Sequence, residues 1–403
     1  MIDKELINQC EIELYNDFKY FEDIALFNQE KVLKAFQEHR LASRHFTGTS
    51  GYGYGDEGRE TLNNVFATIC KAEQAICSPS IVSGTHALSL CLYGVLMPGD
   101  KALCISGVPY DTLQDVIYGE GNGSLKDYGI QFDCIELKND LIDKEKITEY
   151  FNKNGQPKMV YMQRSRGYAW RNAMSVDEIA DAVEFIKSLG FDGCIMLDNC
   201  YGEFIEKQEP TEVGINLMAG SMIKNPGGGI APTGGYVVGD KKYVEKVQNR
   251  LTSPSIGGEV GSYAFGYQYF FQGLFLAPHV VLQAIKGSLL FGAVLSKLGY
   301  ETSPSMDTKP RDIIRAIKFG NANDLISFIQ SIQKCSPIDS HVDALPWAMP
   351  GYEDEVIMAA GCFVQGSSIE LSADAPIKPP YIAYLQGGIT YEHCKLALQS
   401  IKL

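Results

Sequence analysis

The stretch SVDEIADAVEFIKSLGFDGCIMLDN, residues 175–199, predicts a helix followed directly by a buried strand. Ser175 and Glu178 have the spacing of a capping box, in which each side chain binds the other residue's backbone N–H group. Gly190 marks the helix end. The segment GCIMLDN is apolar on both faces, as in a strand covered by helices, and leads into Asp198. Apolar residues recur between these signals at helical spacing: Ile179, Ala182, Val183, Ile186 and Leu189.

Similar units recur through the central part of the chain. Residues 83–105, SGTHALSLCLYGVLMPGDKALCI, predict a helix opened by Ser83 and Gly84, then a turn and a strand. Alternation of helices and strands is typical of an α/β fold with a largely parallel sheet. We therefore expect residues 45–285 to form a large α/β domain.

The two ends of the chain have different patterns. Residues 1–44 contain no glycine or proline and show imperfect helical periodicity, which predicts a helical arm. Residues 286–403 mix helices such as DLISFIQSIQK with antiparallel-looking strands such as CFVQGSSIEL, which indicates a smaller α+β domain. By composition, residues 302–310 and 373–380 are expected to be loops.

Charge and composition exclude several classes of protein. The chain has 403 residues and a formal net charge of -14, with no basic stripe, so we expect no nucleic-acid partner. The acidic N-terminus lacks the basic start of a secretion signal, and no run of about 18 apolar residues follows, so we expect no membrane span and a cytoplasmic protein. The eleven cysteines lack metal-site spacing, which predicts reduced thiols and no metal.

Three features of the α/β region can carry chemistry. The helix start at Ser83, Gly84 and Thr85 resembles a phosphate cradle, although such residues also serve as plain helix caps. Asp198 ends a buried strand, where ligands of parallel sheets bind and where a carboxylate needs a cationic partner. The alternatives are an ion pair with an arginine or a helix cap for the following segment. Lys224, in GSMIKNPGGGIAPTGGYVVG, has no charged neighbour between Glu212 and Asp240. In a desolvated pocket its pKa would fall and the amine would become a nucleophile, whereas on a surface it would be an ordinary solvated lysine.

Taken together, these features favour one cofactor. Pyridoxal 5'-phosphate requires a phosphate cradle, an acid for its ring nitrogen and a lysine for its aldehyde. The alternative is an ordinary α/β protein in which the same residues cap helices and pair charges.

Several segments resemble those of the methionine gamma-lyase-like family often called aluminium resistance proteins. The resemblance covers residue 45 to the C-terminus and implies a fold type I pyridoxal-phosphate enzyme with a mostly parallel seven-stranded sheet and a smaller C-terminal domain. The segments are GYGYGDEGRE, VSGTHAL, YMQRSRGYAW, LDNCYGEF, GSMIKNPGGGIAPTGGYVVG and YLQGGITYEH.

The resemblance also implies roles for single residues. Lys224 would form the Schiff base and Asp198 would hold the pyridine nitrogen, while Tyr110 would stack on the cofactor ring. The phosphate would lie among Ser83, Gly84, Thr85 and Ser221. Tyr54 and Arg59 would reach the phosphate of a neighbouring subunit, which implies a homodimer or homotetramer with shared active sites, and Tyr54 is also a candidate acid or base.

Two departures from the family pattern concern the substrate. Lys378 stands where an arginine is expected to bind the substrate carboxylate, and Arg166 is another candidate for that role. Asn225 and Pro226 follow the lysine where related lyases have other residues, so specificity does not carry over.

The reaction that the resemblance implies is carbon–sulfur cleavage of a sulfur-containing amino acid, at the beta or gamma carbon. The alternatives are another pyridoxal-phosphate reaction, namely transamination, racemisation or aldol-type cleavage, or a protein that keeps the fold without turnover.

Overall fold

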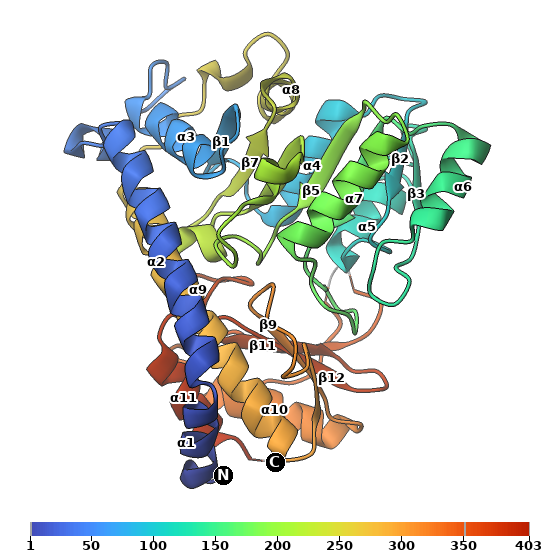
Figure 1. The fold of residues 1–403 in the computed structure, drawn as a ribbon. Coiled ribbons are helices and arrows are strands. Elements are labelled where there is room, and N and C mark those ends of the chain that lie inside the picture. Colours follow the sequence, from blue (N-terminus) through green and yellow to red (C-terminus); the bar gives the residue numbers. More distant parts are fainter. Residues whose placement is uncertain (1, 350–351, 403) are drawn as a thin grey trace.

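The computed structural model describes residues 2–349 and 352–402. Its largest feature is a seven-stranded sheet in the order β1-β7-β6-β5-β4-β2-β3 (Figure 1). Five neighbouring strands run parallel, and β7 is antiparallel to both of its neighbours. The strands are β1 Gln74–Ser78, β2 Lys101–Cys104, β3 Gln131–Cys134, β4 Met159–Gln163, β5 Cys194–Asp198, β6 Leu217–Ser221 and β7 Gly235–Gly239. The predicted α/β fold with a mostly parallel sheet is confirmed.

Helices cover both faces of this sheet. Ile195 and Leu197 of β5 pack into one hydrophobic cluster, and Cys194 and Met196 pack into another, because successive side chains of a strand point to opposite faces. Burial on both sides explains the continuous apolar run of the sequence. The helices of this region are α3 Glu57–Ile69, α4 Gly84–Val95, α5 Asp111–Tyr118, α6 Lys144–Asn154, α7 Val176–Ser188 and α8 Lys241–Leu251.

The unit that the sequence predicted most clearly is present. Ser175 Oγ accepts the backbone N–H of Glu178 at 3.1 Å, and the Glu178 carboxylate accepts the N–H of Ser175 at 3.0 Å, so the capping box at the start of α7 is confirmed. Gly190 follows the helix with a φ of 80°, a backbone conformation that suits glycine. Strand β5 then ends at Asp198.

The N-terminal arm consists of α1 Lys4–Glu13 and α2 Tyr15–Glu38, as its periodicity predicted. In Figure 1, α2 runs alongside α9 Gln268–Lys297. Phe36 and Phe271 meet with their ring centroids 6.1 Å apart, and Lys286 pairs with Glu22 at 3.3 Å. The arm therefore packs on the body of its own chain.

Helix α9 is long and apolar enough to cross a bilayer, judged by length and composition alone. Its most apolar 18-residue window has a mean hydropathy of 1.5, and 67% of that window is buried inside the protein. The expectation of no uninterrupted run of about 18 apolar residues holds, because His279 and Lys286 interrupt the helix, but that expectation did not foresee a helix of this mean hydropathy. Burial in the protein core explains the apolar composition of α9, because this helix packs against α2 and the C-terminal sheet.

The C-terminal part contains a five-stranded antiparallel sheet in the order β10-β11-β12-β9-β8. Its strands are β8 Glu301–Ser303, β9 Ile314–Lys318, β10 Val356–Ala359, β11 Ser372–Pro376 and β12 Ile382–Gln386. Its helices are α10 Ala322–Lys334 and α11 Tyr391–Ser400. Four short 3-10 helices lie elsewhere among the described residues: η1 Ser43–Phe46, η2 Pro210–Val213, η3 Asn225–Gly227 and η4 Gly257–Glu259.

Two local predictions are wrong in this region. Residues 362–371 form an irregular segment and not a strand, and β11 occupies the first half of the expected loop 373–380. Residues 302 and 303 likewise belong to β8. The prolines suggested loops, but Pro376 is only the last residue of β11, where the loss of a hydrogen-bond donor matters least.

The expected domain boundary at residue 286 falls inside α9, which is continuous through it. We propose the same division into a helical arm (1–44), a large domain (45–285) and a small domain (286–403), with α9 as an element shared by the last two.

Candidate active site

One pocket lies at the carboxyl ends of the parallel strands, between the large sheet and the small sheet. Gln163, Asp198 and Ser221 are the last residues of β4, β5 and β6, and all three line it. Its volume is about 340 Å³, within the range of small-molecule sites. The structure brings seven of the predicted site residues together here: Ser83, Gly84, Thr85, Tyr110, Asp198, Ser221 and Lys224.

The N-terminus of α4 forms one side of the pocket. Ser83 caps the helix, and its Oγ accepts the backbone N–H of His86 at 3.0 Å. The N–H groups of Gly84 and Thr85 donate to no protein atom in the part of the chain that the structure describes. These free donors and the partial positive charge of a helix terminus suit a bound anion such as a phosphate group.

Asp198 is a buried acid without an ion pair among the described residues. Its Oδ1 accepts the backbone N–H of Cys200 at 3.0 Å. Burial raises the pKa of Asp198, while this hydrogen bond and the charge of Lys224 offset the rise in part. A cationic group beside the carboxylate would favour its charged form.

Lys224 lies between this acid and an aromatic ring. Its Nζ is 3.9 Å from the centroid of the Tyr201 ring. Burial lowers the pKa of Lys224, but the ionisable groups of Cys200, Tyr201, Asp198 and Glu203 act in the opposite direction, and the net shift is upward. The expectation of a lowered pKa is therefore wrong for the free amine, because the sequence did not show which ionisable groups lie near it.

Other aromatic residues of the pocket were not singled out from the sequence. The hydroxyl groups of Tyr110 and Tyr352 lie 2.6 Å apart, and Tyr168 donates to the Asp374 carboxylate at 2.5 Å. Tyr384 donates to the backbone carbonyl of Tyr168. Tyr168 and Tyr201 belong to quoted motifs, two residues after Arg166 and three after Asp198, but their positions alone did not distinguish them from core tyrosines.

Tyr54 and Arg59 lie away from this pocket. Tyr54 is exposed on the loop before α3, where its ring lies 5.7 Å from that of Tyr52. The Arg59 guanidinium is buried, and it donates to the backbone carbonyls of Gly261 at 3.1 Å and Glu259 at 3.4 Å. Within one chain, neither residue lines the pocket of Lys224.

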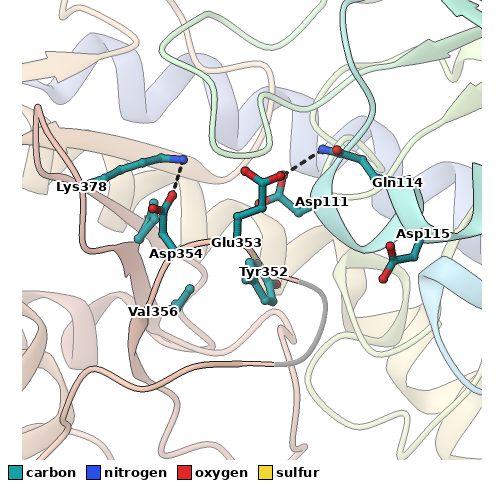
Figure 2. A pocket seen from close by; sticks show the side chains of 9 residues that line it. Asp111, Gln114, Asp115, Tyr352, Glu353, Asp354, Val356 and Lys378 are labelled. Carbon is teal, nitrogen blue, oxygen red and sulfur yellow. Dashed lines mark hydrogen bonds and ion pairs between the residues drawn. The ribbon is translucent and has the colours of Figure 1, made fainter. Parts of the chain in front are cut away.

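The two candidates for binding a substrate carboxylate are also outside the pocket. Lys378 lines a neighbouring pocket of about 290 Å³ and pairs with Asp354 at 2.6 Å (Figure 2). The two pockets share Tyr352. Arg166 is buried and donates to Ser303 Oγ at 2.8 Å. The structure does not bring either cation beside Lys224.

Glu203 is a buried acid behind the lysine. Its Oε1 accepts the Tyr236 hydroxyl at 2.6 Å, and its Oε2 has no partner in the described part of the chain. Burial raises the pKa of Glu203 to about 8, although the Tyr236 hydrogen bond acts in the opposite direction. The folded protein therefore holds a proton here at pH values where the unfolded chain has lost it.

This proton makes stability depend on pH. Because the folded pKa is above the unfolded one, the free energy of unfolding should fall as pH rises from about 4.5 to about 8. Glu203→Gln is neutral throughout and should flatten this decline, with a gain on the order of 2–4 kcal/mol at the upper end. Urea unfolding at several pH values measures the free energy of unfolding of both proteins. The exposed Glu184→Gln is the control, and an unchanged slope in Glu203→Gln would contradict the assignment.

Comparisons with known proteins agree with this geometry. Solved structures with low identity share the fold, among them the pyridoxal-5'-phosphate dependent protein YhfS from Escherichia coli, at 17% identity and a TM-score of 0.63 over 93% of this chain and 95% of that one. Cystathionine gamma synthase from Xanthomonas oryzae pv. oryzae is 14% identical, with a TM-score of 0.60 over 88% and 90%. The fold is thus that of the fold type I pyridoxal-phosphate enzymes.

Closer matches extend over nearly the whole chain. The model of the methionine gamma-lyase family matches residues 3–402, and the chain belongs to this family. The uncharacterized protein YnbB of Bacillus subtilis (strain 168) is 46% identical over 401 residues, which are 98% of this chain and 95% of YnbB. The carbon-sulfur lyase involved in aluminum resistance from Clostridium novyi NT is 47% identical with a TM-score of 0.94, covering 98% of this chain and 95% of that one. Pyridoxal 5'-phosphate is the cofactor of the family.

Proposed function

We propose that this chain is a pyridoxal-phosphate-dependent carbon–sulfur lyase that acts on a sulfur-containing amino acid. The observation that carries the proposal is the pocket in which Lys224, Asp198 and the N-terminus of α4 converge. The family and the relative from Clostridium novyi NT support the reaction class.

The residues of the pocket fit the cofactor. The unpaired N–H groups of Gly84 and Thr85, with the hydroxyl of Ser221, suit its phosphate. Asp198 has no ion pair and a pKa raised by burial, so a protonated ring nitrogen would supply the missing charge. Lys224 would hold the aldehyde covalently, and Tyr110 would lie against the ring.

The remaining chemistry would fall to this chain's own side chains. When bound, the cofactor accepts the electrons released from the substrate's alpha carbon. Asp198 would keep the ring nitrogen protonated. Lys224 Nζ would take the proton from the alpha carbon and return one later in the cycle. The raised pKa of Lys224 means that the free amine has to lose its proton before it can act as a base.

We also propose a homodimer or homotetramer in the cytoplasm. Tyr54 is exposed at the surface, and Tyr52 beside it is exposed as well. Their loop is hydrogen-bonded to residues 261–263, and Phe265 just after that segment is also exposed, which suits an interface between subunits. In such an assembly Tyr54 and Arg59 would approach the neighbouring subunit's site.

Product analysis tests the reaction class. Purified protein incubated with a panel of thioether amino acids should release a thiol, a 2-oxo acid and ammonia in equal amounts, detected by thiol titration, a dehydrogenase-coupled assay and an ammonia assay. Conversion only in the presence of an added 2-oxo acid acceptor would indicate an aminotransferase. Loss of optical activity without any released thiol would indicate a racemase, and either result would overturn the proposal.

A further inference from the structure

We propose that Asp374 and the tyrosines around it form a subsite for a positively charged amino group on the substrate's sulfur substituent. The preferred substrates would then be thioether amino acids that carry a second ammonium group, rather than those with an uncharged alkyl group. This inference rests on the proposed lyase function and names its substrate class.

Asp374 faces the pocket from the small sheet. It is in the middle of β11, and it lies opposite Tyr384 of β12 in the register of the two strands, so the two side chains share a face of the sheet. Both residues line the pocket that contains Lys224. The side chain is buried, and Tyr168 is the only side chain in the described part of the chain that donates a hydrogen bond to it, at 2.5 Å.

Four aromatic rings surround this carboxylate, and we call Tyr110, Tyr168, Tyr352 and Tyr384 the tyrosine wall. Tyr168 is its centre, with ring centroids 5.6 Å from Tyr110, 5.9 Å from Tyr352 and 4.9 Å from Tyr384. Aromatic faces attract cations, and a carboxylate among them adds a full opposite charge. This combination suits an alkylammonium group.

The charges of the pocket leave Asp374 without a cation. Among the described residues that line the pocket, the charged side chains are Asp198, Lys224 and Asp374. Under the proposed function, Lys224 is joined to the cofactor and Asp198 faces the ring nitrogen. A buried carboxylate needs a partner or loses its charge, and an ammonium group on the substrate would supply that partner.

The neighbouring groups do not change this conclusion. The titratable groups that influence Asp374 are Lys224 and five tyrosines, namely Tyr201 and the four members of the tyrosine wall, and the tyrosines are uncharged near pH 6 because burial raises their pKa values. Burial raises the pKa of Asp374 to about 6, and the Tyr168 hydrogen bond and Lys224 act in the opposite direction. The carboxylate is therefore charged above about pH 6, where an alkylamine is still protonated.

The test compares two nearly isosteric substrates, S-(2-aminoethyl)-L-cysteine and S-propyl-L-cysteine. The wild-type kcat/KM for S-(2-aminoethyl)-L-cysteine should exceed that for S-propyl-L-cysteine on the order of 10- to 100-fold. This ratio corresponds to the free energy of a hydrogen bond to a charged group. Asp374→Asn should reduce this preference to about threefold or less while the value for S-propyl-L-cysteine changes little. The control, Asp115→Asn, removes an exposed carboxylate beside the neighbouring pocket and should keep the preference.

Equilibrium binding gives a readout that does not depend on turnover. The analogues 3-[(2-aminoethyl)thio]propanoate and 3-(propylthio)propanoate lack the alpha-amino group, so neither can undergo elimination. An unchanged absorption spectrum of the cofactor after addition of each analogue checks that the aminoethyl group has not condensed with the aldehyde. Calorimetry on the purified protein should show tighter binding of the amine, with a preference that appears as pH rises through about 6. Tyr168→Phe keeps the carboxylate but loses its hydrogen bond, so the preference should persist and appear at a higher pH.

Two results would overturn the subsite. One is equal binding and turnover of the amine and the propyl compound by the wild type. The other is an equal loss of kcat/KM for both compounds in Asp374→Asn, which would indicate that Asp374 has a structural or general-acid role. If both compounds still release a thiol, a 2-oxo acid and ammonia, the lyase function stands although the subsite fails. If neither compound nor its homocysteine homologue yields any thiol, the reaction class fails, while the binding preference still reports on Asp374.

Discussion

Lys224→Ala should remove the yellow Schiff-base colour of the purified protein and lower kcat on the order of 10³- to 10⁴-fold, because the lysine both holds the aldehyde and moves the alpha proton. Lys224 lies in the pocket with Asp198 and over the ring of Tyr201, where no other lysine of the described lining can replace it. Absorption spectra and steady-state kinetics measure the two effects.

The covalent bond between Lys224 and the cofactor can be tested separately. Borohydride reduction followed by proteolysis and mass spectrometry should place the added pyridoxyl group on the peptide that contains Lys224. Lys318→Ala is the control, because Lys318 lies on β9 and pairs with Glu301 at 2.6 Å, and this variant should keep the colour. A label on any other lysine would refute the assignment.

Asp198→Asn should keep the cofactor but lose most of the activity. The N–H groups at the start of α4 and the covalent lysine are unchanged, so the bound cofactor should remain stoichiometric. The amide cannot stabilise a protonated ring nitrogen, and losing one such electrostatic contact costs on the order of 10²- to 10³-fold in kcat.

The measurements for Asp198→Asn are cofactor content after alkaline release, and kcat. Asp177→Asn, an exposed acid in the first turn of α7, is the matched control and should behave as wild type. Turnover of Asp198→Asn near the wild-type rate would show that the acid does not hold the ring.

The regular parts of the fold could be predicted because their signals are local. The capping box of Ser175 and Glu178, the apolar stripe after it and the run that ends in Asp198 each depend on residues that are close in sequence. The position of Asp198 at a strand end also follows from this reading, and ligands of parallel sheets bind at that edge. The position of Ser221 at the end of β6 became visible only in the structure. Lys224 stood out because its neighbours carry no charge.

The substrate side of the pocket could not be predicted in the same way. Asp374 lies in a segment whose prolines indicated a loop, and its pairing with Met358 of β10 and Tyr384 of β12 makes it part of a strand. Its contact with Tyr168 joins residues 206 positions apart. Lys378, expected beside the substrate, instead pairs with Asp354 in the neighbouring pocket.

The sequence by itself determined the α/β architecture, the helix cap at Ser83, the acid at a strand end and the isolated lysine, because short-range patterns specify helices, strands and their ends. Only the tertiary structure decided which of these side chains meet, which ionisable neighbours raise the pKa of Lys224, and that Asp374 faces the pocket from the small sheet. The physical reason is that charges and hydrogen bonds act over a few ångströms in space, whereas the partners lie up to some two hundred residues apart along the chain.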